Sequence, residues 1–176
     1  DGTFEVRDSA NAVVLAGQTS GTGVSGTFAG KTFIGPVTLQ NLASSTVDAE
    51  TLQVTSSTST GLGVGINGII SEAALQDVLT LNKTGAGVVS LGANNTFKGG
   101  ITINQGTLLV MNTPSVVGDS GTGSGSVTVN AGAVLGGIGT IAGPVTLSGS
   151  VGTPATLRPG DPTSILALVE TLTINQ

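Results

Sequence analysis

A short alternation of aliphatic and polar residues recurs along the chain. In each copy two aliphatic residues flank a threonine and a polar residue follows, so a strand would turn the aliphatic side chains to one face and the threonine to the other. The copies are Val37-Thr38-Leu39-Gln40, Leu79-Thr80-Leu81-Asn82, Ile101-Thr102-Ile103-Asn104, Val127-Thr128-Val129-Asn130, Val145-Thr146-Leu147-Ser148 and Leu172-Thr173-Ile174-Asn175. Their starts are separated by 42, 22, 26, 18 and 27 residues, and Leu52-Gln53-Val54-Thr55 is a candidate for a copy hidden in the first interval.

The spacing of this repeat distinguishes a sandwich of hairpins from a stack of parallel coils. A sandwich of hairpins shows a turn roughly every 8–12 residues and pairs neighbouring strands directly. Here the similarity returns after about 20 to 27 residues, which is the length of a coil holding two or three short strands. One copy cannot bury its aliphatic face, whereas copies stacked on each other can. We therefore predict an all-β parallel β-helix, or solenoid, of about eight coils.

One stretch has a different composition. The run Ser71-Glu72-Ala73-Ala74-Leu75-Gln76-Asp77-Val78 contains helix-favouring residues and begins with a serine that is suited to an N-cap. Eight residues are marginal for a helix. The sequence therefore predicts either a short helix or a turn at this place.

Five segments of the chain carry a resemblance to a known repeat. They are Leu81-Asn82-Lys83-Thr84-Gly85-Ala86-Gly87, Leu91-Gly92-Ala93-Asn94-Asn95-Thr96-Phe97-Lys98-Gly99-Gly100, Ile101-Thr102-Ile103-Asn104-Gln105-Gly106-Thr107-Leu108-Leu109-Val110, Gly136-Gly137-Ile138-Gly139-Thr140-Ile141-Ala142-Gly143-Pro144-Val145 and Leu157-Arg158-Pro159-Gly160-Asp161. On these residues, the segment from Leu79 to Gly137 resembles the autotransporter-associated β-strand repeat of large bacterial surface and secreted proteins. Residues 1–78 match only loosely. The resemblance implies a right-handed parallel β-helix, a secreted or cell-surface location and no catalytic residues.

The composition agrees with this architecture and excludes several functions. Glycine reaches 29 residues, charged residues make up only 9% of the chain, and His, Cys, Trp and Tyr are absent. Without cysteine there is neither a disulfide scaffold nor a thiolate metal site, and we expect no cofactor. A net charge of −5 offers no basic stripe for nucleic acid. The apolar runs are short and interrupted by glycine, so we expect no membrane insertion.

Candidate catalytic groups are few and scattered. The ten acidic residues do not cluster, and no histidine is present to activate a serine or threonine. Asp48 and Glu50 would share a strand face. We interpret them as a solvated pair on a loop or edge, which is simpler than a catalytic pair of carboxylates. Asp119 lies in a glycine-rich run that we interpret as a flexible loop between coils, because one acid is too few for a calcium site. We therefore expect no enzyme.

The aromatic residues and the glycosylation sequons add two further expectations. Phe4, Phe28, Phe33 and Phe97 are the only aromatic residues, and we expect them to pack in the core or in a cap. Two sequons begin at Asn82 and Asn94, which are candidates for N-linked sugars, while exposed Ser and Thr rows are candidates for O-linked sugars.

The two ends of the chain differ in character. We expect residues 1–23 to form an N-terminal strand that either caps the body, residues 24–176, or exchanges onto a neighbouring molecule. The C-terminal copy shows no cap, and an uncapped coil end can template association. The candidate self-assembly residues are Phe4, Val6, Val13, Val14, Leu15, Leu172 and Ile174.

These observations predict an extracellular structural solenoid that polymerises head to tail with copies of itself into filaments. Such contacts are heterologous and do not close. One alternative is an adhesin or autotransporter passenger fragment that acts as a rigid stalk and binds surface glycans or matrix. A second alternative is a glycan-active β-helix enzyme, which would require a cluster of acidic residues on one ladder.

Overall fold

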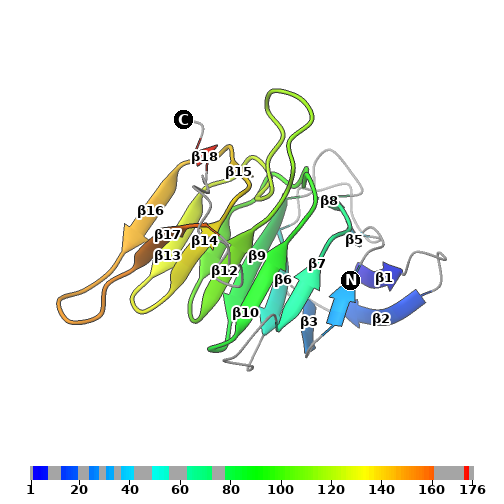
Figure 1. Ribbon diagram of the computed structural model, residues 1–176. Coiled ribbons are helices and arrows are strands. Elements are labelled where there is room, and N and C mark those ends of the chain that lie inside the picture. The colour runs from blue at the N-terminus through cyan, green and yellow to red at the C-terminus, as the bar shows by residue number, and fades with distance from the viewer. Residues whose placement is uncertain are drawn as a thin grey trace.

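The computed structural model describes residues 2–7, 13–19, 24–27, 31–33, 37–41, 49–55, 63–72, 78–160 and 173–174 (Figure 1). Side chains are described for Val54 and for residues 63–72 and 78–160. Within these ranges the regular secondary structure is β-strand throughout, and helix is absent. The predicted all-β, parallel-strand solenoid is confirmed.

Two parallel sheets of six strands each run along the solenoid. Sheet 1 consists of β3 (Val24–Thr27), β6 (Ala49–Thr55), β9 (Val78–Thr84), β11 (Ile101–Ile103), β13 (Val127–Asn130) and β16 (Val145–Ser148), in this spatial order. Sheet 2 consists of β4 (Lys31–Phe33), β7 (Val64–Ile66), β10 (Val88–Leu91), β12 (Thr107–Val110), β14 (Val134–Gly137) and β17 (Thr156–Pro159). The chain places one strand in sheet 1 and the next in sheet 2, so each coil contributes to both sheets.

A third side closes the coils where they leave sheet 2. At one end β5 (Val37–Asn41) and β8 (Ile70–Glu72) pair in parallel on this side. The sheet order there is β2-β1-β5-β8, because β1 (Gly2–Arg7), from before the first coil, pairs antiparallel with β5 and with β2 (Val13–Thr19). At the other end it is the pair β15 (Thr140–Ile141) and β18 (Thr173–Ile174). Between them, segments without strand geometry continue the stacking through backbone hydrogen bonds such as Asn95 N to Ser120 O.

Four successive coils, β9–β10, β11–β12, β13–β14 and β16–β17, lie within residues 78–160. The predicted count of about eight coils is not confirmed. The hidden copy was correctly recognised, because Leu52 of β6 pairs with Leu81 of β9 in sheet 1. The first and last copies of the repeat, in contrast, contribute β5 and β18 to the third side instead of sheet 1.

The strand pairing differs in one place from the pairing expected when the copies of the repeat are aligned residue by residue. Ile101 pairs with Val127, and Val127 with Val145, as the repeat predicts. Ile101, however, pairs with Leu81 and not with Leu79, which is a slip of two residues. A slip of two keeps every inward side chain inward, since strand side chains alternate with a period of two. As a result Lys83 takes the inward position beside Ile103.

The predicted helix or turn at residues 71–78 is wrong at both ends. Ser71 and Glu72 belong to β8, and Val78 begins β9, while residues 73–77 lie outside the described residues. Ser71 pairs with Thr38 of β5, so stacking on the previous coil outweighs local helix propensity.

The core is a set of stacked aliphatic ladders between the sheets. Outward Thr80, Thr102 and Thr128 are only partly buried, whereas the aliphatic residues that flank them are almost fully buried. Phe97 is fully buried in this cluster, which confirms the core placement expected for it. The expected packing of Phe4, Phe28 and Phe33 lies outside the described side chains. Among the described side chains, the interior between the sheets is therefore filled mainly by apolar groups.

Candidate functional site

The third side is held together by two buried asparagines. Asn112, 2% exposed, donates from Nδ2 to Asn94 Oδ1 at 2.8 Å and accepts from Thr140 N at Oδ1 at 2.9 Å. Asn95 accepts from Ile70 N at 2.8 Å and donates to the Gly121 carbonyl. Each amide therefore bridges the coils on either side of it, and supplies the partners that a regular ladder would otherwise provide.

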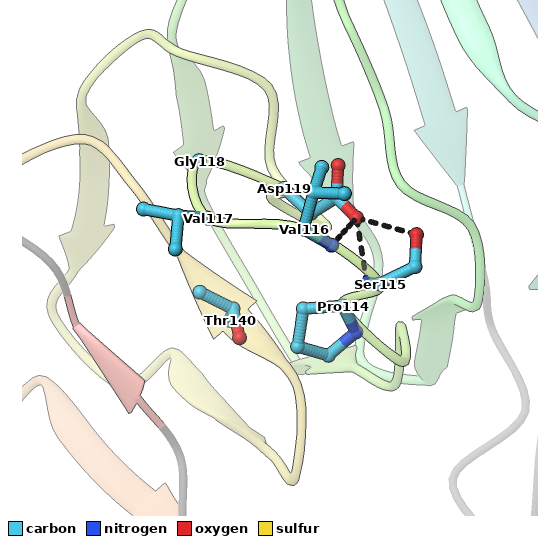
Figure 2. Close-up of a pocket in the computed structure, with 7 residues that line it drawn as sticks. All are labelled: Pro114, Ser115, Val116, Val117, Gly118, Asp119 and Thr140. Carbon is cyan, nitrogen blue, oxygen red and sulfur yellow. Dashed lines mark hydrogen bonds between the residues drawn. The ribbon is translucent and has the colours of Figure 1, made fainter.

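A loop projects from this side after Asn112. Its corner is closed by the Asp119 carboxylate, whose Oδ2 accepts from Ser115 N at 2.7 Å, Ser115 Oγ at 2.9 Å and Val116 N at 3.0 Å (Figure 2). The Asn94 side chain adds a fourth hydrogen bond to the same oxygen at 2.8 Å. The predicted loop between coils is therefore a hydrogen-bonded structure, and not an unstructured connection. The glycine-rich composition gave no signal for this carboxylate cap.

An open depression of about 690 Å³ lies beside the loop. Its lining residues are Pro114, Ser115, Val116, Val117, Gly118, Asp119 and Thr140. Val116 is 66% exposed and Val117 is fully exposed at the tip. The one carboxylate in this lining is already engaged by the loop, so the depression has no ionisable group positioned for acid–base chemistry.

The Asp119 cap predicts a pH response of the loop. Hydrogen bonds from Ser115 N, then Val116 N and then the Ser115 hydroxyl lower the pKa of Asp119 below 3.8. A lowered pKa means that the cap stabilises the loop at pH values above the ordinary carboxyl range and is lost as the pH falls through the lowered value. We expect the amide resonances of Ser115 and Val116 to titrate together with a midpoint below 3.8.

Asp119→Asn is the matched control for this titration, because it retains an acceptor oxygen but cannot ionise. The two amide resonances of this variant should not move over the same pH range. A midpoint at or above the ordinary carboxyl value in the wild-type chain would contradict the cap.

Glu72 has a similar structural role two coils earlier. Its Oε1 accepts from Leu79 N at 3.0 Å and from Lys98 N at 2.8 Å, and its Oε2 lies 3.6 Å from Lys98 Nζ. The Glu72 side chain is 5% exposed. It therefore ties β8 to β9 and to the next coil. Both acidic residues whose side chains the structure describes are thus engaged in holding the backbone.

Lys83 is the most unusual buried group of the described residues. Its side chain is fully buried, and Nζ donates to the carbonyl oxygens of Thr84, Gly85 and Gln105 at 3.0, 2.7 and 2.8 Å. Burial lowers the pKa of Lys83 to about 8, so the amine is mainly charged at neutral pH. Sequence reasoning missed this residue, although the alternation Leu79, Leu81, Lys83 was a signal for its inward position.

The predicted self-assembly residues are placed only through their backbones. In β1, Phe4 lies opposite Gly17 and Leu39, and Val6 lies opposite Leu15 and Val37. Val13 and Val14 belong to β2, and Ile174 of β18 pairs with Ile141. Leu172 lies outside the described residues, as do Asp48 and the side chain of Glu50. The exchange of residues 1–23 between molecules stays a prediction.

The two sequon asparagines have different surroundings. Asn82 is half-buried on the outer face of β9, opposite Thr102. Asn94 Nδ2 donates to the Thr113 carbonyl and to Asp119, so its amide nitrogen is already engaged. Glycosylation of either residue stays a prediction.

Within the part of the chain that the structure describes, His, Cys, Asp and Glu side chains form no group of three or more able to hold a metal ion. The same residues contain no helix that is long and apolar enough to cross a membrane.

The stacked coils and structural polar contacts define a β-solenoid repeat protein. Residues 81–110 match the Passenger-associated-transport-repeat family, which confirms the resemblance to autotransporter-associated repeats. No curated protein and no solved structure matches the chain.

Proposed function

We propose that the chain is a non-enzymatic structural segment of a secreted or cell-surface protein, a rigid β-solenoid of the kind that forms autotransporter passengers. The observation that carries the proposal is the unbroken parallel stacking through residues 78–160, in the same place as the passenger repeat match at residues 81–110. The polar side chains support it. Glu72, Lys83, Asn95 and Asn112 bind backbone groups of neighbouring coils, and Asp119 binds backbone groups of its own loop.

The location is tested by antibody labelling of intact native cells. A secreted or surface segment is expected to be labelled, or found in the medium, before permeabilisation. Labelling that requires permeabilised cells, with none in the medium, would contradict the proposal.

We further propose that copies of the chain assemble head to tail into filaments. Leu147 of β16 and Leu157 of β17 occupy inward positions, opposite buried Val129 and Leu135, yet they are 47% and 36% exposed. Among the described residues, β16 and β17 are the last strands of sheets 1 and 2, so this coil presents apolar side chains together with strand edges that no described strand covers. A second copy that adds a coil here would extend both sheets. We propose that the coils are right-handed, which is the usual hand of crossovers between parallel strands.

Assembly is tested by negative-stain microscopy and sedimentation of the wild-type chain and of the variant Leu147→Lys/Leu157→Lys. We expect wild-type filaments that lengthen with concentration and are lost in this variant. The control Val116→Lys/Val117→Lys adds the same charges at another exposed apolar site, and its filaments should persist.

A monodisperse wild-type rod would contradict filament formation and favour the rigid stalk of an adhesin or passenger. Filaments that persist in the coil-end variant would place the contact elsewhere. Circular dichroism of all three proteins checks that the substitutions leave the β-structure intact.

A further inference from the structure

The outer face of sheet 1 over β9, β11, β13 and β16 is a regular array of uncharged polar side chains. On β9, β11, β13 and β16 the aliphatic residues alternate with residues that point away from the core. One row of outward residues consists of Asn82, Thr102, Thr128 and Thr146, which the strand register places side by side. The row crosses the strands and follows the axis along which the coils stack.

A second row runs parallel to the first. It includes Asn104 and Asn130, whose side chains are joined by a hydrogen bond of 2.9 Å across the strands. Neighbouring strands of a sheet lie about 4.8 Å apart, and alternate residues of one strand lie about 7 Å apart. The face therefore presents hydroxyl and amide groups at nearly constant intervals in two directions.

Charge is absent from this array. The only ionisable side chain on these four strands is Lys83, and it points into the core. Each hydroxyl or amide can both donate and accept a hydrogen bond. Sheet 2 differs, because its outward residues Ser90 and Leu109 are only 7% and 2% exposed. The face on these four strands thus fits a neutral partner rich in hydroxyl groups, because no outward charge on them would attract an anion or a cation.

The described part of the array, on β9, β11, β13 and β16, is small for an interface with a second copy of the chain. Four strands about 4.8 Å apart, with two outward positions each, cover on the order of 200 Å². A stable protein–protein interface buries about 800 Å² on each partner. A narrow array that follows the axis suits a linear chain molecule, whose successive units meet equivalent groups on successive coils.

We infer that the outer face of sheet 1 binds a linear neutral polysaccharide lying along the solenoid axis. The contacts are hydrogen bonds from the two rows to sugar hydroxyls, and one sugar unit of an extended chain is about as long as the spacing of the coils. Each contact is weak because this face has no aromatic side chain for stacking. Binding therefore depends on the number of coils engaged. The inference is independent of filament assembly, which uses the coil end.

The test uses cello-oligosaccharides and chito-oligosaccharides of increasing length, with binding followed by NMR shifts and calorimetry. We expect affinity to rise with oligosaccharide length, and shifts to concentrate on Thr102, Thr128 and Thr146. The variant Thr102→Val/Thr128→Val removes two hydroxyls while keeping side-chain shape and strand propensity. The loss of two hydrogen bonds predicts a loss of affinity of roughly thirtyfold.

Two matched variants complete the design. Thr102→Ser/Thr128→Ser retains the hydroxyls and should bind within about twofold of the wild-type chain, well under 1 kcal/mol. Thr96→Val makes the same chemical change at an exposed threonine of the third side and should bind normally.

Three results would overturn the inference. The first is that the wild-type chain binds neither oligosaccharide series. The second is that the wild-type chain and the double valine variant bind equally well. The third is that the wild-type chain forms dimers and the double valine variant does not. The last would identify a second copy as the occupant of the face. Melting curves of the variants verify that each is folded.

Discussion

Replacing Gly123 with alanine is expected to lower the free energy of unfolding by about 3 kcal/mol or more. Gly123 has a φ of +68°, and a Cβ there would lie 2.1 Å from the carbonyl oxygen of Phe97. That carbonyl accepts from Ser124 N at 3.0 Å and is part of the stacked third side. The backbone cannot move away without breaking this contact, so the steric cost adds to the left-handed penalty.

Gly118→Ala separates the two contributions. Gly118 also has a positive φ, +98°, but nothing lies within 4 Å of the position that its Cβ would take. We expect this variant to lose only the left-handed penalty of roughly 1–2 kcal/mol. Urea denaturation of both variants measures the difference. Equal losses at the two positions would show that the close approach of Gly123 to Phe97 is not important for stability.

Alkaline stabilisation is the second large effect, and Lys83 is its source. The folded pKa of Lys83 is about 8 against an ordinary value of 10.5, so between these values the unfolded chain binds more protons than the folded one. The free energy of unfolding therefore rises with pH over this window, by up to roughly 3 kcal/mol. Below about 8 the lysine is protonated in both states and this dependence disappears.

The chain is well suited to this measurement because it contains no Cys, Tyr or His that would titrate in the same window. Urea denaturation across the window should show the rise in the wild-type protein. Lys83→Met keeps a flexible apolar side chain in the core and removes the titrating amine, so its stability should be nearly independent of pH there. A wild-type stability that is flat or falls above pH 8 would contradict the lowered pKa of this amine.

Several elements were predictable because they depend on the direction of side chains along a single strand. The alternation in Ile101–Ile103, Val127–Asn130 and Val145–Ser148 correctly predicted strands, inward aliphatic residues and parallel stacking. The hidden copy at Leu52 was recognised for the same reason. The assignment of Ser71 and Glu72 to a helix or turn failed, because pairing with β5 decides their conformation.

The candidate sites were less predictable than the strands. Asp119 was correctly interpreted as part of a loop between coils, but its role as the cap depends on Ser115, Val116 and Asn94, the last of which lies 25 residues away. The two rows on sheet 1 were visible in part as a repeated threonine. Their alignment with Asn82 became clear only once the register of β9 against β11 was known.

The amino-acid pattern alone predicted stacked parallel coils with aliphatic ladders inside and threonine and asparagine outside, because strand side chains alternate whatever the rest of the chain does. It did not predict the antiparallel pairing of β1 with β2 and β5. Tertiary packing decided the register, the third side and the burial of Lys83. A slip of two residues leaves the inward and outward pattern unchanged, so the pattern cannot distinguish one register from the other. Only the fit of neighbouring coils, with three carbonyl oxygens around one ammonium and two asparagines bridging the third side, makes that choice.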